Sequence, residues 1–365
     1  MKIIKAKETM NAKTRVRKTF AHEKTDRVTM GYHSNPGINQ RLKETLDIKN
    51  DEELLQALGV DYRKIDAPYI CKPLFEEIPD RKRHPLEGGV MRWIEHSTGG
   101  YWDYCDFPLK DASEEAFETF PVPNPDDFDY QAALKTAKAF GKDMGIFIGG
   151  ANIPDIINSN GRLMGMEDVL CYLVTADEPA IRFMRRRADF LLKMMECLLD
   201  TCKEYVDFIW LGEDLGTQIG PMISRELYIE IMKPIHKQFF DLAKAYSKPS
   251  MIHTCGSSSW LFNDFIEMGV TGVDTLQPEA VNMSPEYLKA HFGNKLCYRG
   301  CISTGGPLVS GTAAEVTENV RKTLEIMMEG YGYHFAPAHA IQDNTPTENA
   351  IAMYQAAHTY GIYGK

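Results

Sequence analysis

Residues 250–276, SMIHTCGSSSWLFNDFIEMGVTGVDTL, decide the fold. The short apolar runs at the two ends of this stretch, Ser250–His253 and Gly272–Leu276, have the composition of buried parallel strands. The residues between them leave room for one helix and two loops. A strand, a helix and a second strand in this order predict a parallel βαβ unit.

The same unit recurs along the second half of the chain. Comparable apolar runs begin at Phe208, Leu296 and Tyr333, so that successive runs begin 22 to 42 residues apart. Helix signals lie between the runs, such as the capping box formed by Thr312 and Glu315. At least five consecutive βα units predict an α/β fold of the (β/α)8 TIM-barrel type.

The first half of the chain is less regular. Val28–Tyr32 and Gly145–Ile148 are predicted strands, and residues 80–130, which mix aromatic and charged side chains, are a predicted insertion or lid. Residues 1–27 predict an irregular N-terminal extension that contains a solvated amphipathic helix, because many lysines and arginines alternate with acidic residues there. No repeat or linker divides the chain, so we expect residues 1–365 to form one barrel domain.

The composition excludes several classes of protein. The 365 residues carry a net charge of −10, whereas a dedicated nucleic-acid-binding protein is basic. No apolar run approaches the length of about 18 residues that a membrane span needs. The eight cysteines form no C-x-x-C pair, and the N-terminus has no apolar export signal. We therefore expect a cytoplasmic protein with reduced thiols that contacts neither nucleic acid nor membrane.

Polar side chains gather where the predicted strands end, which is where the active site of a (β/α)8 barrel lies. His253 and Cys255 are two residues apart on an extended segment, so their side chains point the same way. Imidazole nitrogen and thiolate sulfur are both ligands that zinc prefers, and a catalytic zinc needs three protein ligands. Four residues at other strand ends are candidates for the third ligand: His339, Glu213, Asp214 and Cys301.

Several of these residues have more than one interpretation. Glu213 and Asp214 are candidate metal ligands, candidate general bases, or caps of the following helix. His339 follows a proline and has no apolar periodicity around it, which favours a functional role over packing. His236 and His358 lie in predicted helices, which favours surface or packing roles.

Three segments of the chain resemble the uroporphyrinogen decarboxylase superfamily. They are MIHTCGSSSWLFNDFIEMGVTGVDTLQPEA (251–280), FGNKLCYRGCIST (292–304) and FAPAHAIQDNTPTENAIAMY (335–354). The resemblance extends through most of residues 12–363. It implies a (β/α)8 barrel with its active site at the carboxyl ends of the strands.

The superfamily contains cofactor-free decarboxylases, which hold the acidic side chains of a tetrapyrrole with N-terminal arginines. The corresponding segment here, GYHSNPGINQRLKETL (31–46), contains only Arg41, which argues against a decarboxylase proper. In the alternative of a metal-free, decarboxylase-like lyase acting on a carboxylated substrate, two residues would serve catalysis. The resemblance matches Asp66 to the decarboxylase aspartate and His339 to the histidine before the T-P-x-E-N helix.

The superfamily also contains zinc-dependent corrinoid methyltransferases, whose H-x-C motif is similar to His253 and Cys255. Their third ligand is usually a cysteine just before the T-P-x-E-N helix, where this chain has His339. The resemblance implies a zinc site of these three residues, with Glu213 or Asp214 as further candidates. It also implies transfer of a methyl group between a small molecule, such as a methyl ether or a thiol, and the cobalt of a corrinoid. The chain has no D-x-H-x-x-G cobalamin signature, so we expect a separate corrinoid protein as partner.

Overall fold

Eight parallel strands form one sheet in the order β1-β11-β10-β9-β8-β7-β6-β2. The computed structural model describes residues 2–96 and 99–364. The strands are β1 (Thr29–Met30), β2 (Tyr62–Lys64), β6 (Gly145–Pro154), β7 (Phe208–Gly212), β8 (Ser250–His253), β9 (Gly272–Leu276), β10 (Cys297–Ile302) and β11 (Tyr333–Pro337). The two ends of this order are joined where the backbone N–H of Asp61 donates to the carbonyl of Met30 at 2.9 Å. The strands therefore follow one another around a barrel, which confirms the predicted (β/α)8 fold.

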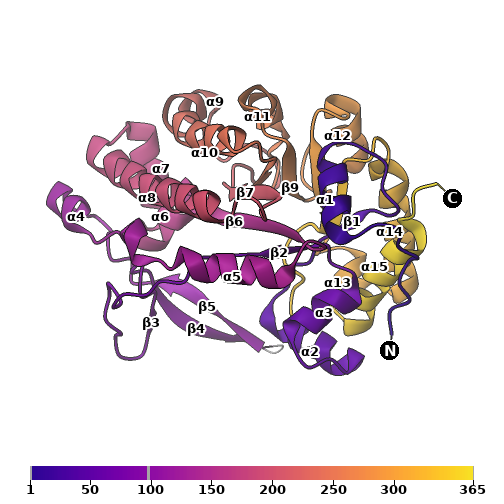
Figure 1. Cartoon of the computed structure of the whole chain (residues 1–365). Coiled ribbons are helices and arrows are strands. Elements are labelled where there is room, and N and C mark those ends of the chain that lie inside the picture. Colours follow the sequence, from indigo (N-terminus) through magenta and orange to yellow (C-terminus); the bar gives the residue numbers. More distant parts are fainter. Residues whose placement is uncertain (1, 97–98, 365) are drawn as a thin grey trace.

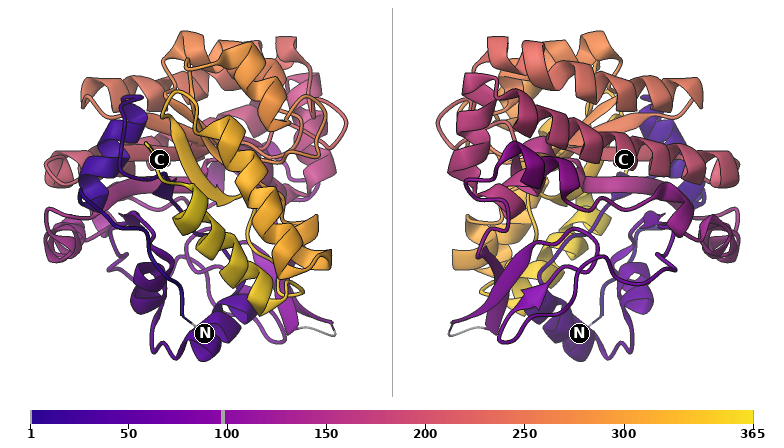
Figure 2. Two further views of the ribbon diagram at one scale, coloured as in Figure 1. Left: turned by 90° about the vertical axis from the view of Figure 1, so that its right-hand side faces the viewer. Right: turned by 90° about the vertical axis from the view of Figure 1, so that its left-hand side faces the viewer.

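Helices follow the strands and lie around the outside of the sheet (Figures 1 and 2). They are α2 (Pro36–Leu46), α3 (Asp51–Leu58), α5 (Tyr130–Phe140), α6 (Ile156–Met164), α7 (Met166–Thr175), α8 (Glu178–Cys202), α9 (Arg225–Leu227), the π-helical turn η2 (Tyr228–Met232), α10 (Lys233–Ala245), the 3-10 turn η3 (Ser259–Leu261), α11 (Phe262–Met268), α12 (Pro285–Phe292), α13 (Pro307–Ser310), α14 (Ala313–Met327) and α15 (Thr347–Tyr360). The predicted capping box is present, because Thr312 and Glu315 bond reciprocally at the start of α14. None of the helices in the described part of the chain combines the length and apolar character that crossing a lipid bilayer requires.

The predicted insertion lies between β2 and β6 and contains a small antiparallel sheet. Its elements are β3 (Lys82–Arg83), β4 (Val90–His96), β5 (Gly99–Cys105), α4 (Glu114–Thr119) and the 3-10 turn η1 (Pro125–Asp127). The three strands pair in the order β3-β4-β5 and lie below α5 in Figure 1. Several aromatic side chains of this sheet are exposed, among them Trp93 and Trp102.

Helix α1 (Ala12–Phe20) packs against the barrel, so the expectation of a solvated helix is wrong. Val16 and Phe20 form a buried cluster with side chains near the amino ends of the strands, including Tyr62, Phe147 and Phe208. Arg15, on the same helix, is also fully buried. The helix is amphipathic as predicted, but its apolar face and part of its charged face are both covered.

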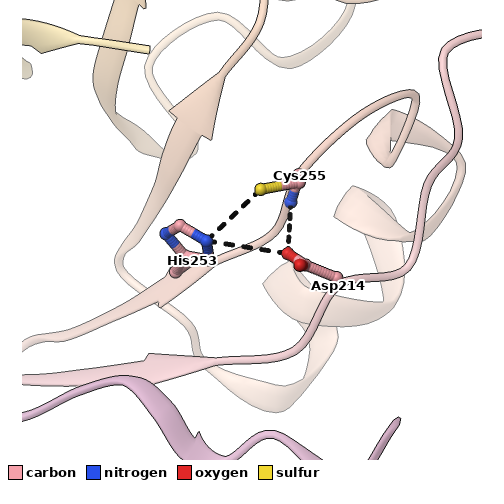
Figure 3. A group of neighbouring side chains, drawn as sticks. All are labelled: Asp214, His253 and Cys255. Carbon is pink, nitrogen blue, oxygen red and sulfur yellow. Dashed lines mark hydrogen bonds and ion pairs between the residues drawn. The ribbon is translucent and has the colours of Figure 1, made fainter. Parts of the chain in front are cut away.

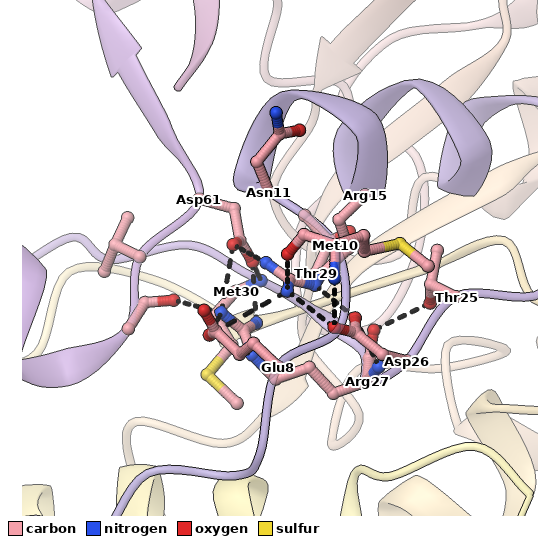
Figure 4. Close-up of polar contacts among 12 residues, drawn as sticks. Glu8, Met10, Asn11, Arg15, Thr25, Asp26, Arg27, Thr29, Met30 and Asp61 are labelled. Atoms are coloured by element: carbon pink, nitrogen blue, oxygen red, sulfur yellow. Dashed lines mark hydrogen bonds and ion pairs between the residues drawn. The ribbon is translucent and has the colours of Figure 1, made fainter. Parts of the chain in front are cut away.

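A network of buried charges joins α1 to the first two strands (Figure 4). Asp61 accepts hydrogen bonds from Arg15 Nη1 at 2.5 Å and from Arg27 Nη1 at 2.7 Å. The backbone N–H of Met30 also donates to Asp61, at 2.7 Å. Because buried charges are stable only when they are paired and hydrogen-bonded, this network fixes α1 against β1 and the segment that precedes β2.

Candidate metal centre

Asp214, His253 and Cys255 meet at the carboxyl ends of β7 and β8 (Figure 3). One ligand atom from each residue lies within 4.8 Å of the others. His253 Nε2 is 3.4 Å from Cys255 Sγ and 3.6 Å from Asp214 Oδ1. Ligand atoms around a tetrahedral zinc ion, with bonds of about 2.0–2.3 Å, lie about 3.3–3.7 Å apart. The donor set and its spacing therefore fit zinc.

The His253 ring is oriented from the neighbouring strand. Its Nδ1 lies 3.1 Å from Asp274 Oδ2, and the hydroxyl of Thr275 also contacts this nitrogen. Asp274 is fully buried, yet the Arg299 guanidinium and the bond to His253 hold its pKa well below its usual range against the effect of burial. An ionised Asp274 accepts the Nδ1 proton, which leaves Nε2 as the free ligand atom. Metal-binding histidines are commonly held in this way.

Backbone and side-chain donors orient Asp214 in the same centre. The backbone N–H of Cys255 donates to Asp214 Oδ1 at 2.9 Å, and Asn158 Nδ2 donates to Oδ2 at 2.8 Å. Gly256 adopts a φ of 69°, and a Cβ atom there would lie 2.4 Å from the carbonyl oxygen of Gly216. The loop that carries Cys255 thus needs glycine at its next position.

The surroundings of Cys255 favour its neutral thiol. Burial raises the pKa of this thiol, and the nearby carboxylates of Asp214 and Asp274 raise it further. Since the thiolate is the form that binds metal, an anionic Cys255 needs a cation beside it. A divalent ion held by Cys255, His253 and Asp214 would supply that charge.

Glu213 precedes Asp214 in sequence but contacts a different part of the molecule. Its fully buried carboxylate accepts hydrogen bonds from the backbone N–H groups of Ile156 at 2.6 Å and Ile157 at 2.9 Å. His236 Nε2 lies 3.1 Å from the same carboxylate. Burial raises the pKa of Glu213 to about 8 and lowers that of His236 to about 3. Glu213 therefore holds the first turn of α6, which precedes β7 in the chain, and not the following helix that its third sequence interpretation named. His236 packs against it.

The other candidates lie outside the group of three. His339 follows β11 and is exposed, with its Nδ1 3.5 Å from Gln342 Nε2. Cys301 is buried within β10. Asp66 follows β2, has a side chain that is 59% exposed, and forms an ion pair with Lys64 at 3.0 Å. Among the ligand candidates of the sequence, the structure therefore brings Asp214 closest to the H-x-C pair.

Sequence reasoning missed the residues that support the centre. Asp274, Arg299 and Asn158 contact the ligand residues or each other but were not candidates. A signal existed for Asp274, because it is a charged residue inside the apolar run of β9. A charge at a buried strand position needs a partner.

These features define the class of protein: a (β/α)8 barrel with a candidate metal centre at the carboxyl ends of two neighbouring strands. The sequence profile of the uroporphyrinogen decarboxylase (URO-D) family matches residues 155–360, which is more than half of the chain. The chain belongs to this family, which confirms the resemblance found in the sequence.

Two relatives bear on its activity and fold. The chain is 25% identical over 196 residues to a methylated-thiol–coenzyme M methyltransferase of Methanosarcina mazei. That match covers 54% of this chain and 49% of the relative, so the chain spans about half the length of the curated relative that it matches. The structure is similar to a solved methyltransferase from Methanosarcina mazei, with a TM-score of 0.64, 15% identity, and coverage of 96% of this chain and 99% of the other. The second similarity confirms the fold.

Proposed function

We propose that the chain is a zinc-dependent methyltransferase that moves a methyl group between a small molecule and the cobalt of a corrinoid carried by a separate protein. The observation that carries this proposal is the group of Asp214, His253 and Cys255, whose donor atoms and spacing suit zinc. Similarity to a methyltransferase of Methanosarcina mazei supports the class of reaction.

The proposed ligands are His253, Cys255 and Asp214, with His339 as the alternative third ligand. When bound, zinc supplies a Lewis acid that stabilises negative charge on the oxygen or sulfur atom that gains or loses the methyl group. Asp274 keeps the His253 ring in one orientation with Nε2 free. The backbone N–H of Cys255 donates to Oδ1 of Asp214 and holds this carboxylate in place. The methyl donor or acceptor is proposed to be a methyl ether, as in O-demethylation, or a thiol.

The remaining candidates have distinct proposed roles. His339, exposed at the end of β11, is proposed to contact the substrate at the mouth of the barrel. Glu213 is proposed as a positioning residue, because it holds the first turn of α6, and α6 carries the Asn158 that bonds Asp214. Asp66 borders a cavity beside the insertion and is proposed to act on ligands there.

Metal analysis of the purified protein tests the proposal directly. We expect about one zinc per chain, lost in Cys255→Ala, because this change removes one of three ligands. Cys171→Ala is the matched control, since Cys171 is exposed on α7 and outside the group. The same variants are then assayed for methyl transfer to cob(I)alamin, followed by its absorption spectrum, with candidate methyl ethers and methylated thiols. A metal-free protein with full methyl-transfer activity would contradict the role of zinc, whereas a metal-free protein without methyl-transfer activity would favour the metal-free lyase.

A further inference from the structure

A cavity of about 170 Å³ lies between the barrel and its insertion. On the barrel side it is lined by the end of β6, by α6 and by α8, and on the other side by the segments around His84–Glu87 and Pro121–Pro123. None of the three candidate metal ligands lines this cavity. Its lining therefore differs from that of the metal centre.

The lining of the cavity combines an apolar wall with cations. Phe190, Leu191 and Met194 lie on one face of α8 and form part of the apolar wall. Arg187 lies one turn earlier on the same helix, and Arg162 reaches the cavity from α6. An apolar surface next to guanidinium groups is the composition that binds an organic anion.

The charge of Arg187 is not neutralised by a close carboxylate. Its Nη1 donates to the carbonyl of Ser159 at 2.9 Å and to Asn160 Oδ1 at 2.7 Å, and both of these acceptors are neutral. Within residues 2–96 and 99–364, Arg187 takes part in no ion pair. Glu87 lines the same cavity and attracts Arg187 only at longer range, while Arg162 repels it. Burial lowers the pKa of the Arg187 guanidinium, and the carboxylates of Glu87 and Asp155 oppose this effect.

The Arg162 guanidinium is also only weakly paired, so it is available to bind an anion. Its one ion pair among the described residues is a long contact of 3.7 Å to Asp155 Oδ2, and its side chain is 30% exposed. This separation is longer than a hydrogen bond, so Asp155 neutralises the Arg162 guanidinium only in part. Lys64, the third cation of the lining, is already paired with Asp66. An excess of positive charge therefore remains at the two arginines.

We propose that this cavity binds a small organic anion, with its carboxylate between Arg162 and Arg187 and its apolar body against Phe190, Leu191 and Met194. Guanidinium groups bind carboxylates through paired, charge-assisted hydrogen bonds. A cavity of about 150 Å³ accommodates benzene, so a body of one ring suits the volume found here. The proposal does not depend on metal binding or on methyl transfer.

Isothermal titration calorimetry with benzoate and benzamide tests the proposal, because the two probes share a ring and differ in charge. We expect saturable binding of benzoate at one site and at least about tenfold weaker binding of benzamide. Arg162→Gln and Arg187→Gln should each weaken benzoate by about tenfold or more. Arg182→Gln is the matched control: it removes an arginine of α8 that is 47% exposed and paired with Glu114, so benzoate affinity should not change.

Two further comparisons separate this site from folding and from the metal centre. Arg187 donates to the backbone of α6, so Arg187→Gln removes a structural contact together with a positive charge. Arg162 makes no short ion pair, so Arg162→Gln removes a positive charge without breaking a contact to the α6 backbone. Cys255→Ala should lose metal and keep its benzoate affinity. Equal affinity for benzoate and benzamide, unchanged benzoate affinity in Arg162→Gln, or no saturable benzoate binding up to about 10 mM would each overturn the proposal.

Discussion

His253 Nδ1 lies 3.1 Å from Oδ2 of Asp274, and the two residues sit opposite each other on neighbouring strands β8 and β9. The same carboxylate accepts a hydrogen bond from Arg299. A buried, ionised aspartate thus fixes the imidazole with Nε2 towards Cys255 and Asp214. Such supporting bonds raise the basicity of a histidine ligand and hold its ring in place.

Replacing Asp274 by asparagine should weaken zinc binding by about 10- to 100-fold, the usual cost of losing such a support. An amide is neutral and accepts the Nδ1 proton less strongly than a carboxylate. Competition with a chelating dye measures the change in affinity. Zinc affinity equal to that of the unmodified protein would show that Asp274 does not act through His253.

Asp264→Asn is the control for general destabilisation. Asp264 is also buried and paired, with Arg225 at 3.0 Å and Lys233 at 2.8 Å, but it lies on α11 at the outside of the barrel. This variant should lose stability without changing zinc affinity. Thermal unfolding followed by circular dichroism records the stability of both variants.

The second prediction concerns the identity of the third zinc ligand. Asp214→Ala should lower zinc occupancy under a competing chelator to about a tenth or less, because it removes a ligand of the group. His339→Ala should keep its zinc and lose activity, since His339 is exposed and proposed to contact the substrate. The reverse pattern, with zinc lost in His339→Ala and kept in Asp214→Ala, would make His339 the ligand.

Local sequence patterns sufficed for the barrel and for the H-x-C pair, but not for the choice between Glu213 and Asp214. Apolar runs and helix caps are local signals, and a spacing of two residues fixes the relative direction of His253 and Cys255. Consecutive residues of an extended segment point in opposite directions, so one of Glu213 and Asp214 had to face the site. Which one does so depends on α6 and on the Cys255 loop, and these are distant in sequence.

The burial of Arg15 was unpredictable for a related reason. A run of lysines and arginines is typical of a solvated helix face, and the partner that changes this outcome, Asp61, lies beyond two intervening helices. The pairing of His253 with Asp274 likewise requires the register of β8 and β9, which the sequence does not contain in any local form. A buried charge such as Asp274 can be noticed in the sequence, but its partner is identified only from the fold.

The third prediction concerns this buried network. Asp61→Asn should lower the free energy of unfolding by about 3 kcal/mol, because two buried guanidinium groups lose the carboxylate that they share and retain only Asp26 and Glu8 as acidic partners. Asp241→Asn is the control: its ion pair with Lys237 is exposed, and the loss should be at most about 1 kcal/mol. Urea titration measures both changes, and equal losses in the two variants would contradict the role of the network.

The fourth prediction is a dependence of stability on pH. Asp26 accepts hydrogen bonds from Arg15 Nε at 2.8 Å and from the backbone N–H of Thr9 at 2.7 Å. Burial opposes ionisation, but these bonds and the charge of Arg15 lower the pKa of Asp26 from 3.8 to about 2. The unfolded chain therefore binds a proton at a higher pH than the folded chain does.

It follows that ionised Asp26 contributes about 2 kcal/mol to the free energy of unfolding. This contribution is almost complete above about pH 4 and is lost as the pH falls towards about 2. Asp26→Asn should be less stable than the unmodified protein at pH 6, and the difference should shrink as the pH falls through this window. Urea titrations of both proteins between pH 6 and pH 2.5 measure the difference. A difference that stays constant over the whole range would show that the ionised form of Asp26 is not what stabilises the fold.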